Sequence, residues 1–304
     1  MITNFEYEGL YYKDNSFLIC VGIKSDITKA KLHENTEIID SKAFECSNIK
    51  EIIFNENLQK IGDSAFAYSK IENINLPKSI KIIESYAFHN CHSLKKVNLA
   101  NTDIRVLKAG TFYFCTGLEN IQFPEKFTTI RDSCFEDCRK LKDIVLPDTV
   151  RIIDNRAFKN TAIENITIPP RVLELNNEAF CDCKKLNKIN LNNVQEIYDN
   201  VFANNPNLKD IELPKSLKFI YMSAFENTGI NVIILPSNIN YLNINNSVNI
   251  HEIRYETLKE DVRLEIKNKC DKFGILFTQI DLNYLLDQGK SLREINAYYN
   301  EQER

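Results

Sequence analysis

Cysteine and histidine are the residues of this chain whose types and spacing first suggest chemistry. The segment from His89 to His92 contains Cys91, and Cys115 follows one repeat further along the chain. Thiol and imidazole groups are the ligands that zinc prefers, but a closed zinc site needs four converging donors, usually supplied as two closely spaced pairs. No second pair of this kind accompanies the segment in the sequence. We therefore predict no metal site and no cofactor.

The motifs that carry catalysis are also missing from the sequence. None of the four histidines belongs to an H-E-x-x-H pair. The eight glycines are too dispersed for a phosphate-binding loop, a dinucleotide fingerprint or a G-x-S-x-G elbow. Acidic residues are plentiful, but they fall at repeat positions where a solvated charge is the ordinary explanation. We predict that the protein is not an enzyme.

A phenylalanine, usually preceded by a small residue, recurs along most of the chain. Successive marks are separated by 22, 22, 24, 23, 23, 22, 22 and 23 residues. The marks are Phe44, Phe66, Phe88, Phe112, Phe135, Phe158, Phe180, Phe202 and Phe225. A period of this length is typical of solenoids, in which each repeat forms one coil of the chain. The spacing predicts about nine tandem turns.

Each repeat carries two short aliphatic segments around its phenylalanine. One aliphatic residue lies five positions before the mark, and an alternating segment such as Ile74 to Pro77 lies further upstream. In an extended I-x-L segment the aliphatic side chains point to one face and the middle side chain to the other. A single coil of this size cannot bury a core, so the coils must stack about 4.8 Å apart. We predict that the phenylalanines stack ring against ring inside.

Five cysteines follow the phenylalanine marks and precede the next aliphatic residue by three positions. Asn, Ser or Thr fills the equivalent place in the other turns. A free cysteine packs like a small hydrophobic residue, so one repeated position of this kind indicates a structural column. We predict that column for Cys46, Cys91, Cys115, Cys138 and Cys183.

The repeat unit L-x-x-I-x-L-P, followed by V-x-x-I-x-x-x-A-F-x-x-C/N, resembles the BspA-like class of leucine-rich repeats, whose repeats have about 23 residues. The resemblance covers about Gly9 to Pro236. It implies a β-rich leucine-rich-repeat solenoid. It also implies a binding role, because members of this class are frequently surface-associated binding proteins of bacteria and of parasitic protists.

The two ends of such a solenoid need caps, since each end would otherwise expose an apolar cross-section. The segment from Phe5 to Ile23 predicts a β-hairpin with a turn at 13–16, and 239–244 predicts a degenerate final coil. We therefore divide the chain into an N-terminal cap at 1–26, a solenoid at 27–245 and a mainly helical C-terminal segment at 246–304.

Several elements are predicted within the C-terminal segment. Thr257 and Glu260 have the spacing of a capping box, which predicts a helix to about Lys272 with a stop at Gly274. A short strand follows at 275–279, and helices are predicted at 282–288 and from Ser291 to Tyr299. This segment is either a terminal cap or a docking element for a partner.

The middle residues of the alternating segments form one candidate binding surface. These residues point outward, and most of them are amides or other uncharged groups that can hydrogen-bond a peptide or a sugar. We predict binding residues at Asn75, Asn98, Gln122, Thr167, Asn190 and Glu212. The alternative is that the amides hydrogen-bond one another along their own ladder, which requires no ligand.

A second candidate surface is aromatic. Tyr198 and Tyr221 occupy the same outward position in adjacent turns, beside Phe219 and Met222. Exposed aromatic residues grouped in this way are typical of interface hot spots. We predict that Tyr198, Phe219 and Tyr221 bind a partner. The alternative is that the C-terminal segment folds back and buries them.

Composition narrows the partner and the compartment. The formal net charge is −4 and the pI is about 5.7, so nucleic acid is a disfavoured partner. No apolar run has the length of a membrane span, and the N-terminus lacks the pattern of a secretory signal. We predict a cytoplasmic, non-catalytic scaffold for a protein partner. The alternatives are export without a visible signal as an adhesin, or a nucleic-acid-associated regulator that acts through its C-terminal helices.

Overall fold

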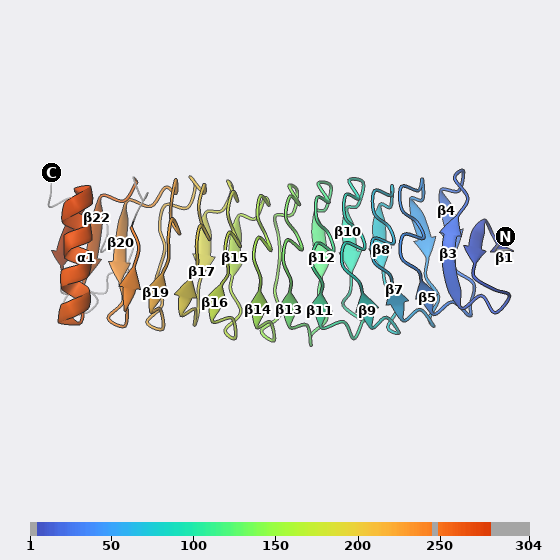
Figure 1. Ribbon diagram of the computed structural model, residues 1–304, viewed down its shortest axis with the longest axis horizontal. Helices are drawn as coiled ribbons and strands as arrows, with labels where there is room; N and C mark the ends of the chain where they lie inside the picture. The colour runs from blue at the N-terminus through green and yellow to red at the C-terminus, as the bar shows by residue number, and fades with distance from the viewer. Residues whose placement is uncertain (1–4, 245–248, 281–304) are drawn as a thin grey trace.

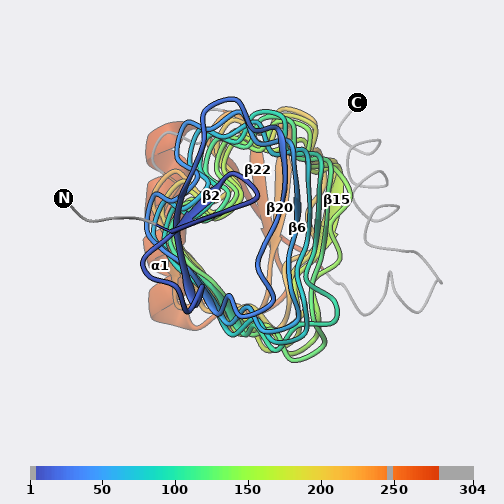
Figure 2. The ribbon, with the colours of Figure 1, turned by 90° about the vertical axis from the view of Figure 1, so that its right-hand side faces the viewer.

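The computed structural model describes residues 5–244 and 249–280, which form a long solenoid (Figure 1). The N-terminal strand β1 (Phe5–Tyr7) lies at one end and helix α1 (Glu260–Phe273) lies at the other. Viewed along the long axis, the coils superpose and enclose a common interior between two rows of strands (Figure 2). The predicted fold class, a β-rich leucine-rich-repeat solenoid, is confirmed.

The first ladder consists of the alternating segments, which pair in parallel along the solenoid. In β8, Ile74 is buried while Asn73 and Asn75 on either side of it are exposed, as the alternation predicts. The strands of this ladder are β4 (Lys29–Lys31), β6 (Glu51–Ile53), β8 (Asn73–Asn75), β10 (Lys96–Asn98), β12 (Asn120–Gln122), β15 (Asn165–Thr167), β17 (Lys188–Asn190), β20 (Val232–Leu235), β22 (Glu252–Tyr255) and β23 (Leu276–Gln279).

The second ladder consists of shorter strands that pair in parallel. In every turn that has a phenylalanine mark, the strand ends at the aliphatic residue five positions before that phenylalanine. Its strands are β3 (Ile19–Ile23), β5 (Ile38–Ile39), β7 (Lys60–Ile61), β9 (Ile82–Ile83), β11 (Val106–Leu107), β13 (Thr129–Ile130), β14 (Ile152–Ile153), β16 (Glu174–Leu175), β18 (Glu196–Ile197), β19 (Phe219–Ile220) and β21 (Tyr241–Leu242).

These eleven strands give the solenoid about eleven turns, where the phenylalanine marks indicated nine. The two additional turns lie at the ends and have no phenylalanine mark. Strand β3 is the last strand of the predicted N-terminal hairpin, antiparallel to β2 (Leu10–Tyr12), and it also pairs in parallel with β5 as the first turn. Strand β21 forms the coil that was predicted at 239–244, and it is the last strand of the second ladder.

The nine phenylalanine rings form one continuous stack through the core. Neighbouring ring centroids are 4.7–6.1 Å apart, and the ring planes lie within 17° of one another. All nine rings are buried. The predicted interior stack is confirmed, and it has a simple cause: parallel pairing in register places equivalent side chains of successive coils directly above one another.

Two residues in each marked turn adopt a left-handed backbone, two positions before and two positions after the phenylalanine. Around Phe88 these residues are Tyr86, with φ 56°, and Asn90, with φ 57°. This conformation is costly for a residue with a side chain. Here it turns the amides of Tyr86, Phe88 and Asn90 toward the next coil, where each donates to a backbone carbonyl at 2.8–3.0 Å. A third row of hydrogen bonds between turns therefore offsets the backbone cost.

The buried column behind the phenylalanines contains Cys91, Cys115, Cys138 and Cys183, as predicted. Each thiol donates to the carbonyl of the phenylalanine one turn earlier, at 3.0–3.2 Å. The prediction is wrong for Cys46, which is exposed and left-handed. Its turn has one residue fewer between the phenylalanine and the next aliphatic residue, so Ser47 occupies the buried place instead.

Thiol labelling tests this column. Burial raises the pKa of Cys183 to about 11 and that of Cys20 to about 12, so these thiols stay neutral and covered near pH 8. We expect about one of the nine cysteines to react rapidly with a thiol reagent in the native protein, and all nine after denaturation. Cys46→Ser should remove the rapid phase. Two or more rapid equivalents would contradict the buried column.

The C-terminal end departs from the sequence prediction in two ways and agrees with it in two others. Helix α1 begins at Glu260 after Lys259, which makes no side-chain cap, so the capping box predicted at Thr257 is wrong. The stop at Gly274 is confirmed by its left-handed φ of 68°. Strand β22 continues the first ladder beyond residue 245, where the solenoid was expected to end, and the predicted strand at 275–279 is present as β23. The helices predicted at 282–288 and 291–299 lie outside the described residues.

Helix α1 takes the place of a second-ladder strand between β22 and β23. It lies on the side of the solenoid opposite β6, β15 and β20 (Figure 2). Its buried residues are Val262, Ile266 and Cys270, and Lys269 donates to the carbonyl of Leu242 in β21 at 3.0 Å. The helix therefore covers the C-terminal end of the second ladder.

Candidate binding surfaces

The alternative of hydrogen bonds along the ladder is observed for part of the outward row of the first ladder. Asn98 donates its side-chain amide to the amide oxygen of Asn75 at 2.9 Å, so these two residues bond along the ladder. The amide oxygen of Asn190 accepts the backbone N–H of Asn192. Gln122 and Thr167 are exposed, and no side-chain hydrogen bond to either is found among the described residues. Only part of the predicted row is thus open to a ligand.

Exposed aliphatic side chains and a hollow accompany this row. Ile53 is 55% exposed and Val145 is 84% exposed, although both lie mid-segment on the outward face. A shallow hollow of about 530 Å³ lies beside Ile53 and is lined by Phe54, Asn75 and Pro77, among others. These residues give the N-terminal half of the face a partly apolar character.

The predicted aromatic surface is present on the second ladder. We define the tyrosine patch as Tyr198, Phe219, Tyr221 and Tyr241. The rings of Tyr198 and Tyr221 are stacked at 4.9 Å between centroids, and Tyr221 lies 6.1 Å from Phe219 and 5.8 Å from Tyr241. All four side chains are half-buried. Tyr241 was not predicted, although its place in register with Phe219 in the adjacent turn was a usable signal.

Carboxylates border the tyrosine patch. Tyr221 donates its hydroxyl to Glu196 at 3.3 Å, and Glu196 is in register with Phe219. Partial burial, together with the charges of Glu196 and Glu174, raises the pKa of Tyr198 to about 12. The pKa of Tyr221 is raised for the same reasons, so Tyr198 and Tyr221 are neutral at ordinary pH and lie beside negative charge.

The described part of the C-terminal segment reaches only one end of this patch. Lys269 of α1 places its ammonium 4.7 Å from the centroid of the Tyr241 ring. Tyr198 and Tyr221 remain half-buried beyond it, so α1 does not bury them. The remainder of the segment, at 281–304, lies outside the described residues.

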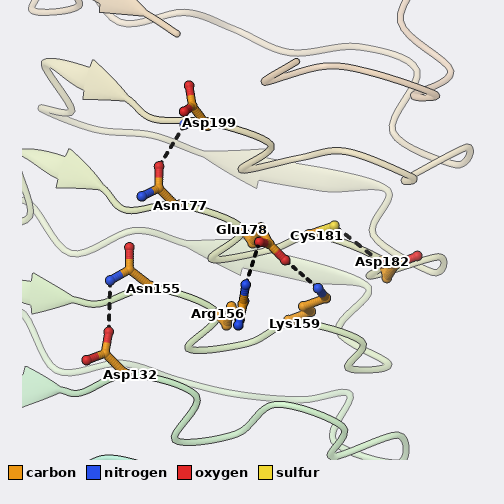
Figure 3. Close-up of polar contacts among 9 residues, drawn as sticks. All are labelled: Asp132, Asn155, Arg156, Lys159, Asn177, Glu178, Cys181, Asp182 and Asp199. Carbon is orange, nitrogen blue, oxygen red and sulfur yellow. Dashed lines mark hydrogen bonds and ion pairs between the residues drawn. The ribbon is translucent and has the colours of Figure 1, made fainter. Parts of the chain in front are cut away.

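Sequence reasoning missed a polar groove at the bend after the second ladder (Figure 3). It has a volume of about 490 Å³. One side is a row of four Asp and Asn residues from successive turns, which was a signal available in the sequence. The groove is lined by Asp132, Ser133, Asn155, Arg156, Asn177, Glu178, Asp199 and Asn200.

The polar groups of this groove largely satisfy one another. Asn155 donates to Asp132 at 2.9 Å, and Asn177 accepts the backbone N–H of Asp199 at 3.1 Å (Figure 3). Glu178 accepts hydrogen bonds from Arg156 and Lys159. Partial burial alone would raise the pKa of Glu178, but these two cationic partners hold the pKa below its usual value. We interpret the side chains of the groove as a hydrogen-bonded ladder that links successive turns.

The histidine and cysteine segment does not converge on one point. The Cys91 thiol points inward to the Phe66 carbonyl, while the His92 ring lies 3.2 Å from the Thr116 hydroxyl. Across residues 5–244 and 249–280, no group of three or more His, Cys, Asp or Glu side chains is arranged to hold a metal ion. No helix within those same ranges has the length and apolar character needed to cross a membrane.

Two parallel ladders around a stacked phenylalanine core define a leucine-rich-repeat solenoid. Within that class, the chain belongs to the family described as the BspA type leucine rich repeat region, which matches residues 20–142 and 128–254 in six copies. This confirms the family resemblance of the repeat unit. No curated protein matches the chain.

Solved structures share the fold at low identity. A leucine-rich repeat protein from Bacteroides ovatus is 21% identical with a TM-score of 0.58, over 84% of each chain. A leucine rich cell surface protein from Faecalibacterium prausnitzii is 17% identical with a TM-score of 0.57, over 97% of each chain. The pneumococcal vaccine antigen PcpA is 18% identical with a TM-score of 0.50, over 84% of this chain and 80% of that one.

Proposed function

We propose that this protein is a non-catalytic scaffold that binds another protein through the outward faces of its solenoid. The observation that carries the proposal is the tyrosine patch, in which aromatic side chains of successive turns lie stacked and half-exposed. Tyrosine is enriched among the residues that dominate binding energy at protein interfaces. Tyr198 packs partly against the core, yet all four rings keep part of their surface exposed and available to a partner.

The outward row of the first ladder is the second part of the proposed surface. Gln122, Thr167 and Glu212 would supply hydrogen bonds to a partner, with Ile53 and Val145 as apolar contacts. We expect Asn75, Asn98 and Asn190 to contribute less, because their amides already have partners within the protein. Hydrogen bonds at the solvent-exposed rim of an interface usually add less to affinity than aromatic side chains that lose their water on binding.

Site-specific crosslinking tests this proposal. A photo-reactive residue at position 221 should capture a protein in cells of the source organism, and the same residue at the exposed Lys126 should not. The captured protein is then purified and titrated calorimetrically. Replacing Tyr198 and Tyr221 together with alanine should weaken its binding about 30-fold or more, as expected for a hot spot.

The matched control is Lys126→Ala, which should bind the purified partner as the wild-type protein does, and circular dichroism should show both variants folded. Equal affinity of the double variant and the wild-type protein would overturn the role of the patch. Capture of no protein at any position, together with turnover of a small molecule by the purified chain, would overturn the scaffold itself.

A surface-exposed adhesin of the same fold is a second candidate. The structural neighbour from Faecalibacterium prausnitzii is described as a cell surface protein, and this favours export. Fractionation of the source cells separates the candidates. Recovery of the chain in the cytosol alone would remove the adhesin, and protease-accessible chain on intact cells would remove the cytoplasmic scaffold.

A further inference from the structure

The tyrosine patch already holds one cation of the chain itself. At the C-terminal end of the patch, the Lys269 ammonium lies 4.7 Å from the centroid of the Tyr241 ring, within the range of a cation–π contact. The same ammonium donates to the Leu242 carbonyl at 3.0 Å and to Glu265 at 2.6 Å. A tyrosine of this patch, with oxygen acceptors beside it, thus forms a complete site for a lysine.

The other end of the patch is Tyr198. One face of its ring stacks on Tyr221, with only 17° between the planes. In the preceding turn, the same row holds Asn176, whose side-chain amide donates to the Ile153 carbonyl at 2.9 Å and is therefore directed away from Tyr198. Among the residues that the structure describes, no Lys or Arg lies over the Tyr198 ring as Lys269 lies over Tyr241.

Negative charge surrounds this end. Glu174 and Glu196 are in register on β16 and β18, and both act electrostatically on the Tyr198 hydroxyl. Neither carboxylate forms an ion pair with any residue in the described ranges. The nearest lysine along the adjacent row, Lys218, donates its ammonium to Gln195 at 3.0 Å. The end of the patch therefore offers an aromatic face and two carboxylates without a matching cation.

We propose that Tyr198, together with Glu174 and Glu196, binds a lysine or arginine side chain in a basic segment of the partner protein, in the way that Tyr241 binds Lys269. This inference rests on the proposed function, and it specifies the chemistry of the partner. A ring face attracts a cation through its quadrupole, and the flanking carboxylates add Coulomb attraction and hydrogen-bond acceptors. An acidic or purely apolar segment would gain neither contribution.

The test uses the full chain and a dye-labelled eight-residue oligolysine, with oligoglutamate as the opposite probe, followed by fluorescence anisotropy. Oligolysine should bind and oligoglutamate should not, and the binding should weaken as salt rises. Tyr198→Leu should weaken oligolysine binding about 5- to 30-fold, from cation–π energies converted to affinity. Tyr198→Phe keeps the ring and should bind as the wild-type protein does. Glu196→Gln should weaken binding.

The matched control for charge is Glu119→Gln, an exposed glutamate in another part of the solenoid, which should leave oligolysine binding unchanged. Wild-type affinity in Tyr198→Leu, or equal losses in Glu119→Gln and Glu196→Gln, would overturn the cation site. If the captured partner still depends on the tyrosine patch in that case, only the inferred chemistry fails. If Tyr198→Leu weakens oligolysine binding but substitutions in the tyrosine patch leave the affinity of the captured partner unchanged, the proposed function fails instead.

Discussion

Replacing Phe158 with alanine is expected to lower the free energy of unfolding by about 3–5 kcal/mol. The ring is completely buried in the middle of the stack, 5.4 Å from Phe135 and 5.3 Å from Phe180. Its removal leaves a cavity that the neighbouring coils cannot close, because their spacing is set by parallel backbone pairing on both sides. Urea denaturation followed by circular dichroism measures the change.

The matched control for Phe158 is Val145→Ala. Val145 is 84% exposed, so its truncation should change the stability by no more than about 0.5 kcal/mol. Phe158→Leu should fall between the two variants, since it retains part of the volume. A loss below about 1 kcal/mol for Phe158→Ala would show that the stack does not carry the core.

Replacing Arg254 with methionine is expected to destabilise the C-terminal turns by about 3–5 kcal/mol. Arg254 is fully buried on β22 and donates to Glu252, which is 3% exposed, at 2.5 Å. Without the guanidinium the Glu252 carboxylate would stay buried without this counter-charge. Because each coil contacts mainly its neighbours, the loss should concentrate in β20, β22 and β23. Amide hydrogen exchange read by mass spectrometry resolves this location.

The double variant Arg254→Met with Glu252→Leu provides the control for this pair. It removes both charges and replaces them with apolar groups, so the C-terminal protection should largely return. Unchanged exchange in Arg254→Met would contradict the importance of the buried pair. Equal loss of exchange protection in the single and double variants would show that the effect comes from packing by the arginine stem and not from charge.

Much of the interior could be predicted from the sequence, because the repeat itself encodes it. The spacing of the phenylalanines and the I-x-L alternation indicated which side chains point inward, and the ring stack follows once equivalent residues lie above one another. The prediction failed where the repeat changes length. Cys46 has the same distance to the next aliphatic residue as Cys91, yet the shorter turn places it on the surface. The spacing along the chain shows that a turn is one residue shorter, but it does not show whether the shortening falls before or after the buried position.

The candidate surface was only partly predictable for a related reason. The alternation places Asn75, Gln122 and Tyr198 on outward faces, but it does not say which of them already have partners. Asn98 reaches Asn75, and α1 brings Lys269 onto Tyr241 from a distant point in the sequence. Such contacts depend on the register between coils and on where the helix packs.

The sequence by itself determined that this chain is a leucine-rich-repeat solenoid with a phenylalanine core, because a periodic pattern of burial is compatible with few folds. It also contains no recognisable catalytic motif. Only the tertiary structure decided the number of turns, the continuation of the first ladder past residue 245, and the place of Lys269 at one end of the tyrosine patch. The physical reason is that periodicity specifies contacts between equivalent residues, whereas caps and patches arise from contacts between residues that are not equivalent.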